Sequence, residues 1–210
     1  MAEIKINVAR VGFIQTNCYF ILNDETKKGI IVDPGDEADY IEDCVKQLEM
    51  VPEALFLTHA HYDHIGAVGE IKEKYKVPVY VHEADIPMLE DKSKNMGMTE
   101  YHLRGDDVIL HGGEELDIAG MKIQVIHTPG HTPGGVCYYF KGNSFLISGD
   151  TLFRFSWGRT DFPGGDERAI MSSIREKLLP LPEDTRVFPG HDSPTRIGDE
   201  RRIHGYKEQI

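Results

Sequence analysis

Residues 54–64, with the sequence ALFLTHAHYDH, place a short apolar run directly before a cluster of histidine and aspartate side chains. The four apolar residues at the start have the composition of a buried strand. Residues two apart in an extended chain point the same way, so we expect His59, His61 and Asp63 to converge on one side. His64 breaks this period where the chain turns into a helix. Because imidazole and carboxylate groups bind divalent ions, this loop predicts a metal centre and can serve two sites.

A helix is predicted directly after this loop. Its apolar positions repeat near a period of 3.6 residues and are Ile65, Val68, Ile71 and Tyr75. We expect Asp63 or His64 to lie close to its capping position.

Three further apolar runs end on a small residue that is followed by histidine or aspartate. Val125-Ile126 leads to Pro129-Gly130-His131, Phe145–Ile147 leads to Gly149-Asp150, and Val187-Phe188 leads to Pro189-Gly190-His191. Strand ends are where a scaffold can bring distant ligands together, and the glycines allow the close backbone approach that a crowded site needs. The candidate metal ligands, enough for two ions, are therefore His59, His61, Asp63, His64, His131, Asp150 and His191.

The overall charge limits the class of partner. Asp and Glu outnumber Lys and Arg by 35 to 23, which gives a formal net charge of -12. Such a chain repels nucleic acid backbones, and the sequence contains no basic cluster, so we expect a small-molecule substrate and no nucleic acid partner. Residues 1–14 show neither a secretory signal nor a membrane span, which predicts a cytoplasmic protein that does not enter a membrane. The sequence leaves the oligomeric state open.

The length of 210 residues fits one domain, so we predict a single domain over residues 1–210. The three cysteines, Cys18, Cys44 and Cys137, are widely spaced in apolar contexts, which predicts free thiols. Strands are predicted at Ile4–Val8, Cys18–Leu22, Gly29–Val32, Ala54–Leu57, Val79–Val81, Val108–Leu110, Met121–Ile126, Val136–Phe140, Phe145–Ile147 and Arg186–Phe188. Further helices are predicted at Asp36–Leu48, near Glu70, at Glu83–Leu89 and at Asp166–Leu178. Hairpins beside helical connections indicate an α/β (α+β in some schemes) protein with mixed sheets and helices outside.

The string Thr58–His64, followed by His131, Asp150 and His191 in that order, resembles the metallo-β-lactamase superfamily. The resemblance covers nearly the whole chain and implies a four-layer αββα sandwich with metals at one edge of two mixed sheets. It assigns one ion to His59, His61 and His131, the other to Asp63, His64 and His191, and the bridge between them to Asp150. Flavodiiron members carry glutamate in place of His61, and many secreted lactamases differ at His64 or Asp150.

Two further segments, TPGHTPG at 128–134 and GRTDFPGGD at 158–166, resemble the small single-domain relatives of glyoxalase II, the hydroxyacylglutathione hydrolases. This implies hydrolysis of a thioester by a metal-bridging hydroxide, with Asp63 orienting the hydroxide or carrying its proton. Zinc suits the donor set best, and iron or manganese also fit. Long glyoxalase II enzymes have a helical C-terminal domain that contacts glutathione, whereas only residues 192–210 follow the last ligand here. The acyl group and the thiol carrier therefore stay open.

Three alternatives remain at this point. A persulfide dioxygenase needs one iron held by two histidines and a carboxylate. A hydrolase of another ester, a lactone or a β-lactam uses the same ions. A binding module without catalysis would hold metal and turn over nothing.

Several residues outside the ligand set are candidates for supporting roles. Asp33 and Thr58 are candidate hydrogen-bond partners of the metal-binding histidines. Arg154, Trp157 and Arg159 are candidates for the rim of the substrate pocket, although an arginine paired with Asp161 or Asp166 fits equally well. Residues 91–105 are a candidate lid or a solvated connector. We expect no metal at His82, His102, His111, His127 and His204.

Overall fold

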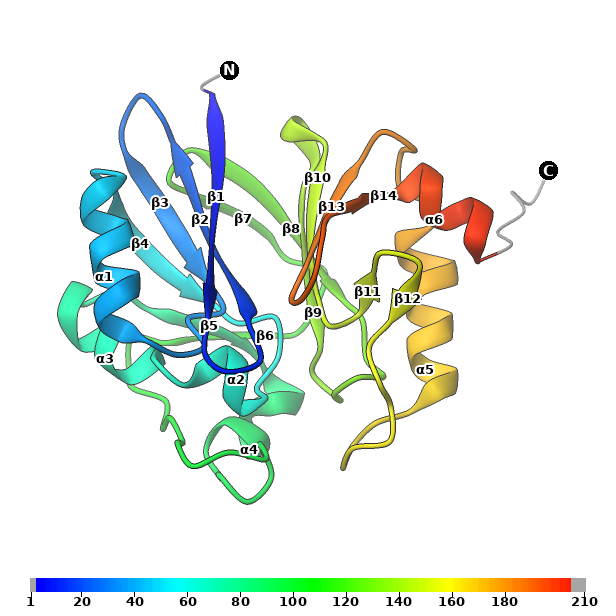
Figure 1. The fold of residues 1–210 in the computed structure, drawn as a ribbon, viewed down its shortest axis with the longest axis horizontal. Helices are drawn as coiled ribbons and strands as arrows, with labels where there is room; N and C mark the ends of the chain where they lie inside the picture. The colour runs from blue at the N-terminus through cyan, green and yellow to red at the C-terminus, as the bar shows by residue number, and fades with distance from the viewer. Residues whose placement is uncertain (1–2, 205–210) are drawn as a thin grey trace.

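Two six-stranded sheets face each other in the computed structural model, which describes residues 3–204 (Figure 1). The first sheet runs in chain order through β1 (Ile4–Val11), β2 (Thr16–Asn23), β3 (Lys28–Val32), β4 (Val51–Phe56), β5 (Val79–His82) and β6 (Val108–Leu110). Its first three strands are antiparallel and the rest are parallel, so the sheet is mixed. Every residue of β2 is buried, as expected of a strand that is covered on both faces.

The second sheet has the order β14-β13-β10-β9-β8-β7. Its strands are β7 (Glu115–Ile118), β8 (Met121–His127), β9 (Val136–Phe140), β10 (Phe145–Gly149), β13 (Arg186–Pro189) and β14 (Thr195–Arg196). Only β10 and β13 pair in parallel, and the short 3₁₀ turn η2 (Lys141–Asn143) closes the predicted hairpin between β9 and β10. A separate hairpin of β11 (Leu152–Phe153) and β12 (Ser156–Trp157) follows β10.

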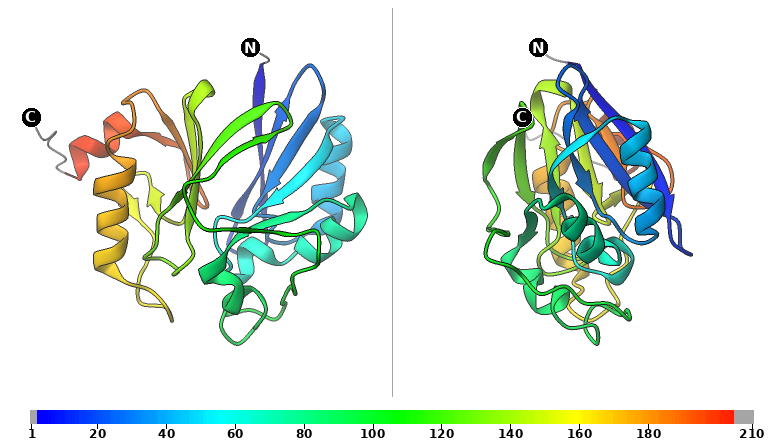
Figure 2. Two further views of the ribbon diagram at one scale, coloured as in Figure 1. Left: turned by 180° about the vertical axis from the view of Figure 1, so that it is seen from behind. Right: turned by 90° about the vertical axis from the view of Figure 1, so that its left-hand side faces the viewer.

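Helices cover the outer face of each sheet (Figure 2). On the first sheet lie α1 (Ala38–Gln47) and α3 (Val68–Tyr75), and on the second lie α5 (Glu167–Ser172), its π-helical continuation η3 (Ser173–Leu178) and α6 (Ile197–Ile203). Three shorter elements, α2 (Tyr62–Ile65), η1 (Glu83–Asp85) and α4 (Ile86–Leu89), lie in the connections of the first half.

Three apolar clusters separate these four layers. Successive residues of β2 point to opposite faces, so Phe20 packs beneath the helices of the first sheet and Ile21 packs between the sheets. Tyr138 and Ile147 meet Ile21 from the second sheet, and Ile174 of η3 belongs to the third cluster outside it. The predicted four-layer αββα architecture is confirmed.

All of the predicted strands are present, with small differences at their ends. The strands that the sequence did not predict are β7, β11, β12 and β14, because they are short or half-polar and carry too little periodic signal. The three cysteines are free, as predicted. Among the described residues, no helix combines the length and the apolar character needed to cross a membrane.

One predicted helix differs in its boundaries. The helix after the metal-binding loop already begins at Tyr62, and α2 is separated from α3 by a break at Ala67. The N-cap of α2 is His61, and Asp63 follows two residues later, so Asp63 lies close to the capping position but is not the cap itself. Asp63 therefore lies in the first turn of a helix and not in the extended segment that carries His59 and His61.

Candidate metal centre

Three histidines from two loops form the first donor set. His59 and His61 lie on the loop between β4 and α2, and His131 lies on the loop between β8 and β9. One ligand atom from each lies within 4.8 Å of the others. His61 Nδ1 is 2.9 Å from His131 Nε2, a distance at which two nitrogen lone pairs repel unless a proton or a cation lies between them.

The second donor set combines α2 with the loop after β13. Asp63, His64 and His191 again bring one ligand atom each within 4.8 Å of the others. Asp63 Oδ2 lies 3.2 Å from both His64 Nε2 and His191 Nε2.

Asp150 lies between the two sets, directly after β10. Its Oδ1 is 3.5 Å from His64 Nε2, and its Oδ2 is 3.6 Å from His131 Nε2 and 3.5 Å from His191 Nε2. Gly190 makes this approach feasible, because a side chain there would overlap Asp150 Oδ1. The structure thus brings together all seven predicted donors and puts the predicted bridge in the middle.

The hydrogen bonding of these donors fits bound cations. Buried polar atoms are rarely left without a partner in folded proteins. Within residues 3–204, the buried atoms of the centre that have no hydrogen-bond partner include His59 Nε2, His64 Nε2 and Asp150 Oδ1. Donor atoms of the types that bind zinc or iron are therefore free to bind an ion.

Asp33 sets the proton positions on two of the histidines. It is 1% exposed and lies at the end of β3, where its Oδ1 accepts the Thr58 backbone N–H and its Oδ2 accepts the Thr58 hydroxyl. His64 Nδ1 is 2.9 Å from the same Oδ2 and must donate to it, which leaves the His64 Nε2 lone pair facing the centre. The Thr58 hydroxyl has already donated its proton, so it accepts from His59 Nδ1 at 3.1 Å. The supporting roles predicted for Asp33 and Thr58 therefore fit the geometry.

His131 is oriented in the same way by a backbone group. Its Nδ1 donates to the Arg159 carbonyl at 2.7 Å, so its Nε2 lone pair faces Asp150 and His61. Such partners fix both the tautomer and the ring orientation of a ligand histidine.

Two residues at the start of β2 also shape the centre, although the sequence analysis did not single them out. The Thr16 hydroxyl donates to Asp63 Oδ2 at 2.8 Å. The Asn17 amide donates to the carbonyls of Pro189 and Asp192, on either side of His191. Each is far in sequence from the residue that it positions, so no local pattern indicates the contact.

Asp85 joins the two loops of the first donor set and was likewise missed. It is fully buried, and its carboxylate accepts the Ala60 N–H, the Gly134 N–H and the Thr132 hydroxyl at 3.0, 2.6 and 2.8 Å. Ala60 lies between His59 and His61. One carboxylate therefore fixes the spacing between the β4–α2 loop and the loop that carries His131.

We expect Asp85→Ala to destabilise the protein and weaken metal binding. The substitution leaves two backbone donors and one hydroxyl buried without an acceptor, so the free energy of unfolding should fall by about 3 kcal/mol. Affinity for the first ion should fall at least about tenfold, because the spacing of its ligands is no longer held. Denaturant unfolding and metal titration measure the two effects. Glu83→Ala, on the same short turn but exposed and paired with His111, is the matched control. Wild-type stability of the Asp85 variant would contradict this role.

The electrostatics of the two sets differ. Burial and the neighbouring His64 hold the pKa of His59 well below its usual range, and burial with the neighbouring His131 lowers that of His61 to about 3. These imidazoles are therefore neutral, as ligands must be. Burial alone would lower the pKa of His64, but the carboxylates of Asp63, Asp33 and Asp150 outweigh it and raise that pKa. The second set therefore attracts positive charge.

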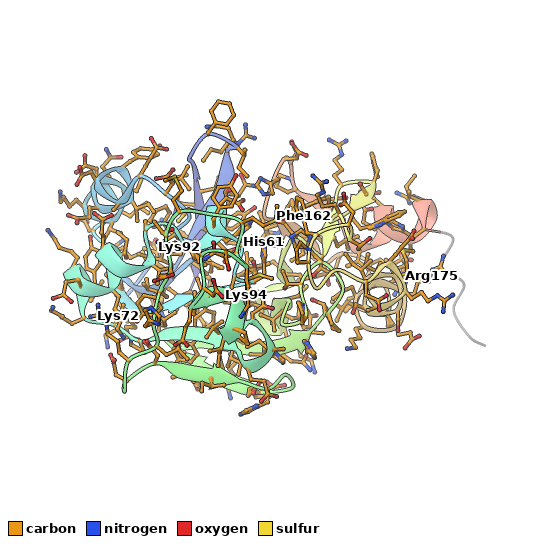
Figure 3. The ribbon with its side chains drawn as sticks, turned by 90° about the horizontal axis from the view of Figure 1, so that it is seen from below. His61, Lys72, Lys92, Lys94, Phe162 and Arg175 are labelled. Atoms are coloured by element: carbon orange, nitrogen blue, oxygen red, sulfur yellow. The ribbon has the colours of Figure 1, made fainter. Side chains whose placement is uncertain are left out.

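A cleft of about 540 Å³ opens onto the donors. Besides ligand residues, it is lined by Ile14, Tyr62, Met96, Phe153, Ser156, Trp157, Arg159 and Phe162. Phe162 packs edge-on against His61 with ring centroids 5.6 Å apart, and the two side chains lie beside each other near the centre of the molecule (Figure 3). The wall is mainly apolar around a polar floor, as in many small-molecule sites.

The candidates for the pocket rim divide into two groups. Trp157 and Arg159 line the cleft, but Arg159 makes two hydrogen bonds with Asp161 and stacks on Phe162, so its charge is already partnered. Arg154 does not line the cleft and instead lines a different pocket. Within residues 91–105, Met96 reaches the cleft and the Asn95 carbonyl accepts the Tyr62 N–H, so part of this connector lies over the site.

The histidines that were predicted to bind no metal lie outside both donor sets and are not grouped with Asp150. They have other contacts: His82 stacks on His127, while His102, His111 and His204 lie near glutamates.

Comparison with known protein families supports this picture. The model of the metallo-beta-lactamase superfamily matches residues 11–191. The chain is 43% identical over 195 residues to the probable metallo-hydrolase YqgX of Bacillus subtilis, covering 91% of this chain and 92% of the relative. It is 36% identical over 208 residues to the hydroxyacylglutathione hydrolase GloC of Haemophilus influenzae, covering 97% and 98%.

Two solved structures share the fold closely. The B3 metallo-beta-lactamase BLEG-1 has a TM-score of 0.89 and 40% identity, over 94% of this chain and 97% of its own. TTHA1623, solved in a di-iron-bound form, has a TM-score of 0.83 and 37% identity, over 94% and 98%.

Proposed function

Because the chain belongs to the metallo-β-lactamase superfamily, we propose that this metallo-hydrolase cleaves a small thioester, as a hydroxyacylglutathione hydrolase does, with two divalent metal ions. The observation that carries the proposal is the arrangement of seven donors in two sets joined by Asp150. Divalent ions bound there would supply a water acidic enough to act as a nucleophile at neutral pH and would stabilise negative charge on a carbonyl oxygen. We further propose that the chain is a single cytoplasmic domain.

The residues of the chain would position water and substrate. Burial opposes ionisation of Asp63, but His64 and His191 outweigh it and hold the pKa of Asp63 below its usual range, so this side chain is a carboxylate. Its Oδ2 accepts from Thr16, which fixes its orientation toward the cleft. Asp63 can therefore hold a water or accept its proton at a fixed position. A thiolate leaves readily, which agrees with the shortage of acidic groups elsewhere in the cleft.

The donor set suits zinc, and the proposal allows iron, which the related TTHA1623 contains in its di-iron-bound form. Imidazole and carboxylate donors do not separate these metals by themselves.

We expect removal of the metals to abolish thioester hydrolysis and lower stability. Protein purified without chelator should contain about two ions per chain and release thiol from S-D-lactoylglutathione. Dialysis against a chelator should lower the rate by more than about a hundredfold, and adding back zinc, iron or manganese separately should show which ion restores it. Elemental analysis, a thiol assay and thermal unfolding follow the three quantities. Loss of metal with unchanged turnover would contradict the proposal.

The same protein sample tests the competing functions. One iron per chain with oxygen uptake on a persulfide would support the dioxygenase alternative, and the complete second donor set argues against it. Hydrolysis of a lactone or β-lactam, but of no thioester, would show that the substrate belongs to that other class. Bound metal without turnover of any substrate would support a binding module.

A further inference from the structure

Three arginines that are far apart in sequence line one surface pocket of about 430 Å³. Arg154 lies in the turn between β11 and β12, Arg186 begins β13, and Arg196 ends β14. The other lining residues are Phe155, Phe188, Pro194, Thr195 and Asp199. We call this the arginine pocket. It is separate from the metal cleft, which is lined by Phe153, Ser156 and Trp157 of the same hairpin and shares no lining residue with the arginine pocket.

Two of these arginines lie directly opposite each other. Arg186 of β13 pairs with Arg196 of β14 across the antiparallel ladder, so their side chains leave the same face of the sheet. Like charges at such a position repel and destabilise a strand pair. The second sheet therefore carries an unfavourable contact at its edge, which an anion bound between the two guanidinium groups would relieve.

Asp199 lines the arginine pocket, but its carboxylate pairs with none of the three arginines in residues 3–204. Arg154, Arg186 and Arg196 form no ion pair in this part of the chain, and Arg154 and Arg186 instead approach the rings of Phe155 and Phe188. Asp199 at the rim pairs with Arg202. An uncompensated group of three cations is unexpected in a protein with a net charge of -12.

Buried contacts hold the walls of the arginine pocket in place. Glu200 is fully buried, and its carboxylate accepts the Phe155 N–H from the hairpin turn and the Thr195 hydroxyl from β14. It thereby joins the turn that carries Arg154 to the strand that carries Arg196. Phe155 has a φ of 64°, a conformation that side chains rarely adopt and that the surroundings must maintain.

We propose that the arginine pocket binds a phosphate group, either as free phosphate or on a phosphorylated small molecule. A phosphate offers three or more acceptor oxygens and a charge near -2, which matches three guanidinium groups better than the two oxygens of one carboxylate. The cavity is larger than a phosphate ion and leaves room for part of the molecule that bears it. A bound phosphate would also brace the β11–β12 hairpin, which contributes residues to the metal cleft.

Thermal unfolding with inorganic phosphate tests the pocket directly. Phosphate should raise the melting temperature of the wild type above that in chloride of equal ionic strength. Without phosphate, Arg196→Gln should be at least as stable as the wild type, because the repulsion with Arg186 is gone. Its affinity for phosphate should be at least about tenfold weaker than that of the wild type.

Arg175→Gln is the matched control. Arg175 is an exposed arginine on η3 that does not line the pocket and points away from the body of the protein (Figure 3). It should keep the wild-type response to phosphate. The same phosphate response in wild type, Arg196→Gln and Arg186→Gln would overturn the proposal, as would no response in the wild type.

A second measurement separates the two sources of phosphate, and it rests on the proposed thioesterase function. Hydrolysis of a short acyl thioester on a phosphorylated pantetheine carrier is compared with the same thioester on the unphosphorylated carrier. An increase in KM of about tenfold in Arg196→Gln for the phosphorylated carrier alone assigns the pocket to the substrate. Equal KM values, with the phosphate-dependent melting shift retained in the wild type, assign it to free phosphate or another phosphorylated molecule. If no thioester is hydrolysed, the proposed function fails, while the melting experiment still decides on the pocket.

Discussion

Asp150→Asn should eliminate most of the hydrolytic activity while the fold is kept. Asp150 lies within 3.6 Å of histidines from both donor sets, and its buried Oδ1 has no hydrogen-bond partner in the part of the chain that the structure describes. The amide keeps the shape but loses the charge that would hold two cations together. We expect turnover to fall by more than about a hundredfold. Loss of a residue that only supports a ligand lowers activity by up to about a hundredfold, and Asp150 is itself a proposed ligand. Metal content should fall from about two ions per chain to one or fewer.

Stability distinguishes loss of a metal bridge from general damage. The metal-free Asp150→Asn protein should unfold at a temperature close to that of the metal-free wild type, because Asp150 Oδ1 has no hydrogen-bond partner in residues 3–204 and the amide loses only the attraction to the imidazoles of His64 and His191. Only the additional stability from added metal should be lost. Asp117→Asn, an exposed aspartate on β7, is the control and should match the wild type throughout. Two tightly bound ions and normal turnover in Asp150→Asn would exclude the bridging role.

The sequence analysis could find the candidate ligands because each stands in a local pattern that carries information. Each of the four segments joins an apolar strand to a small residue and then to a donor, and the ends of buried strands meet at one edge of the sandwich. The strands themselves are predictable for the same reason, since β2 and β9 are buried along their whole length.

The residues that hold the ligands in place could not be found in this way. Thr16 and Asn17 lie at the start of a strand that looks like any other, and Asp85 stands in a short turn without a recognisable motif. Their partners lie tens of residues away or more: Thr16 contacts Asp63, and Asn17 contacts the loop of His191. Such contacts depend on how two sheets and their loops pack, and one sequence alone does not contain that information.

The arginine pocket also arises from residues that are far apart in the sequence. The sequence contains no basic cluster, and this observation alone suggested that no concentrated positive charge exists. The pairing of β13 with β14 places Arg186 opposite Arg196, and the β11–β12 turn adds Arg154. Because β14 has only two residues, the sequence pattern could not predict the strand that creates the cluster.

Asp33→Asn should weaken the second metal site more than the first. Asp33 Oδ2 accepts protons from the Thr58 hydroxyl and from His64 Nδ1. The amide NH2 group at the position of Oδ2 cannot accept a proton, so His64 would have to move its own proton to Nε2, the nitrogen that faces Asp63 and Asp150. A protonated Nε2 has no lone pair for a metal. We therefore expect the affinity of the second ion to fall by about 10–100-fold, with a comparable loss of activity at limiting metal.

The prediction is testable because only one of the two metal sites should be weakened. His59 receives its orientation through Thr58, whose hydroxyl can rotate, whereas the proton of His64 is fixed by Asp33 alone. Metal titration should thus show one binding step close to that of the wild type and one step shifted to higher concentration, and high metal should restore part of the activity. Asp39→Asn, an exposed aspartate on α1, should leave both steps unchanged. An equal shift of both steps in Asp33→Asn would show that Asp33 supports the loop as a whole and does not set the tautomer of His64.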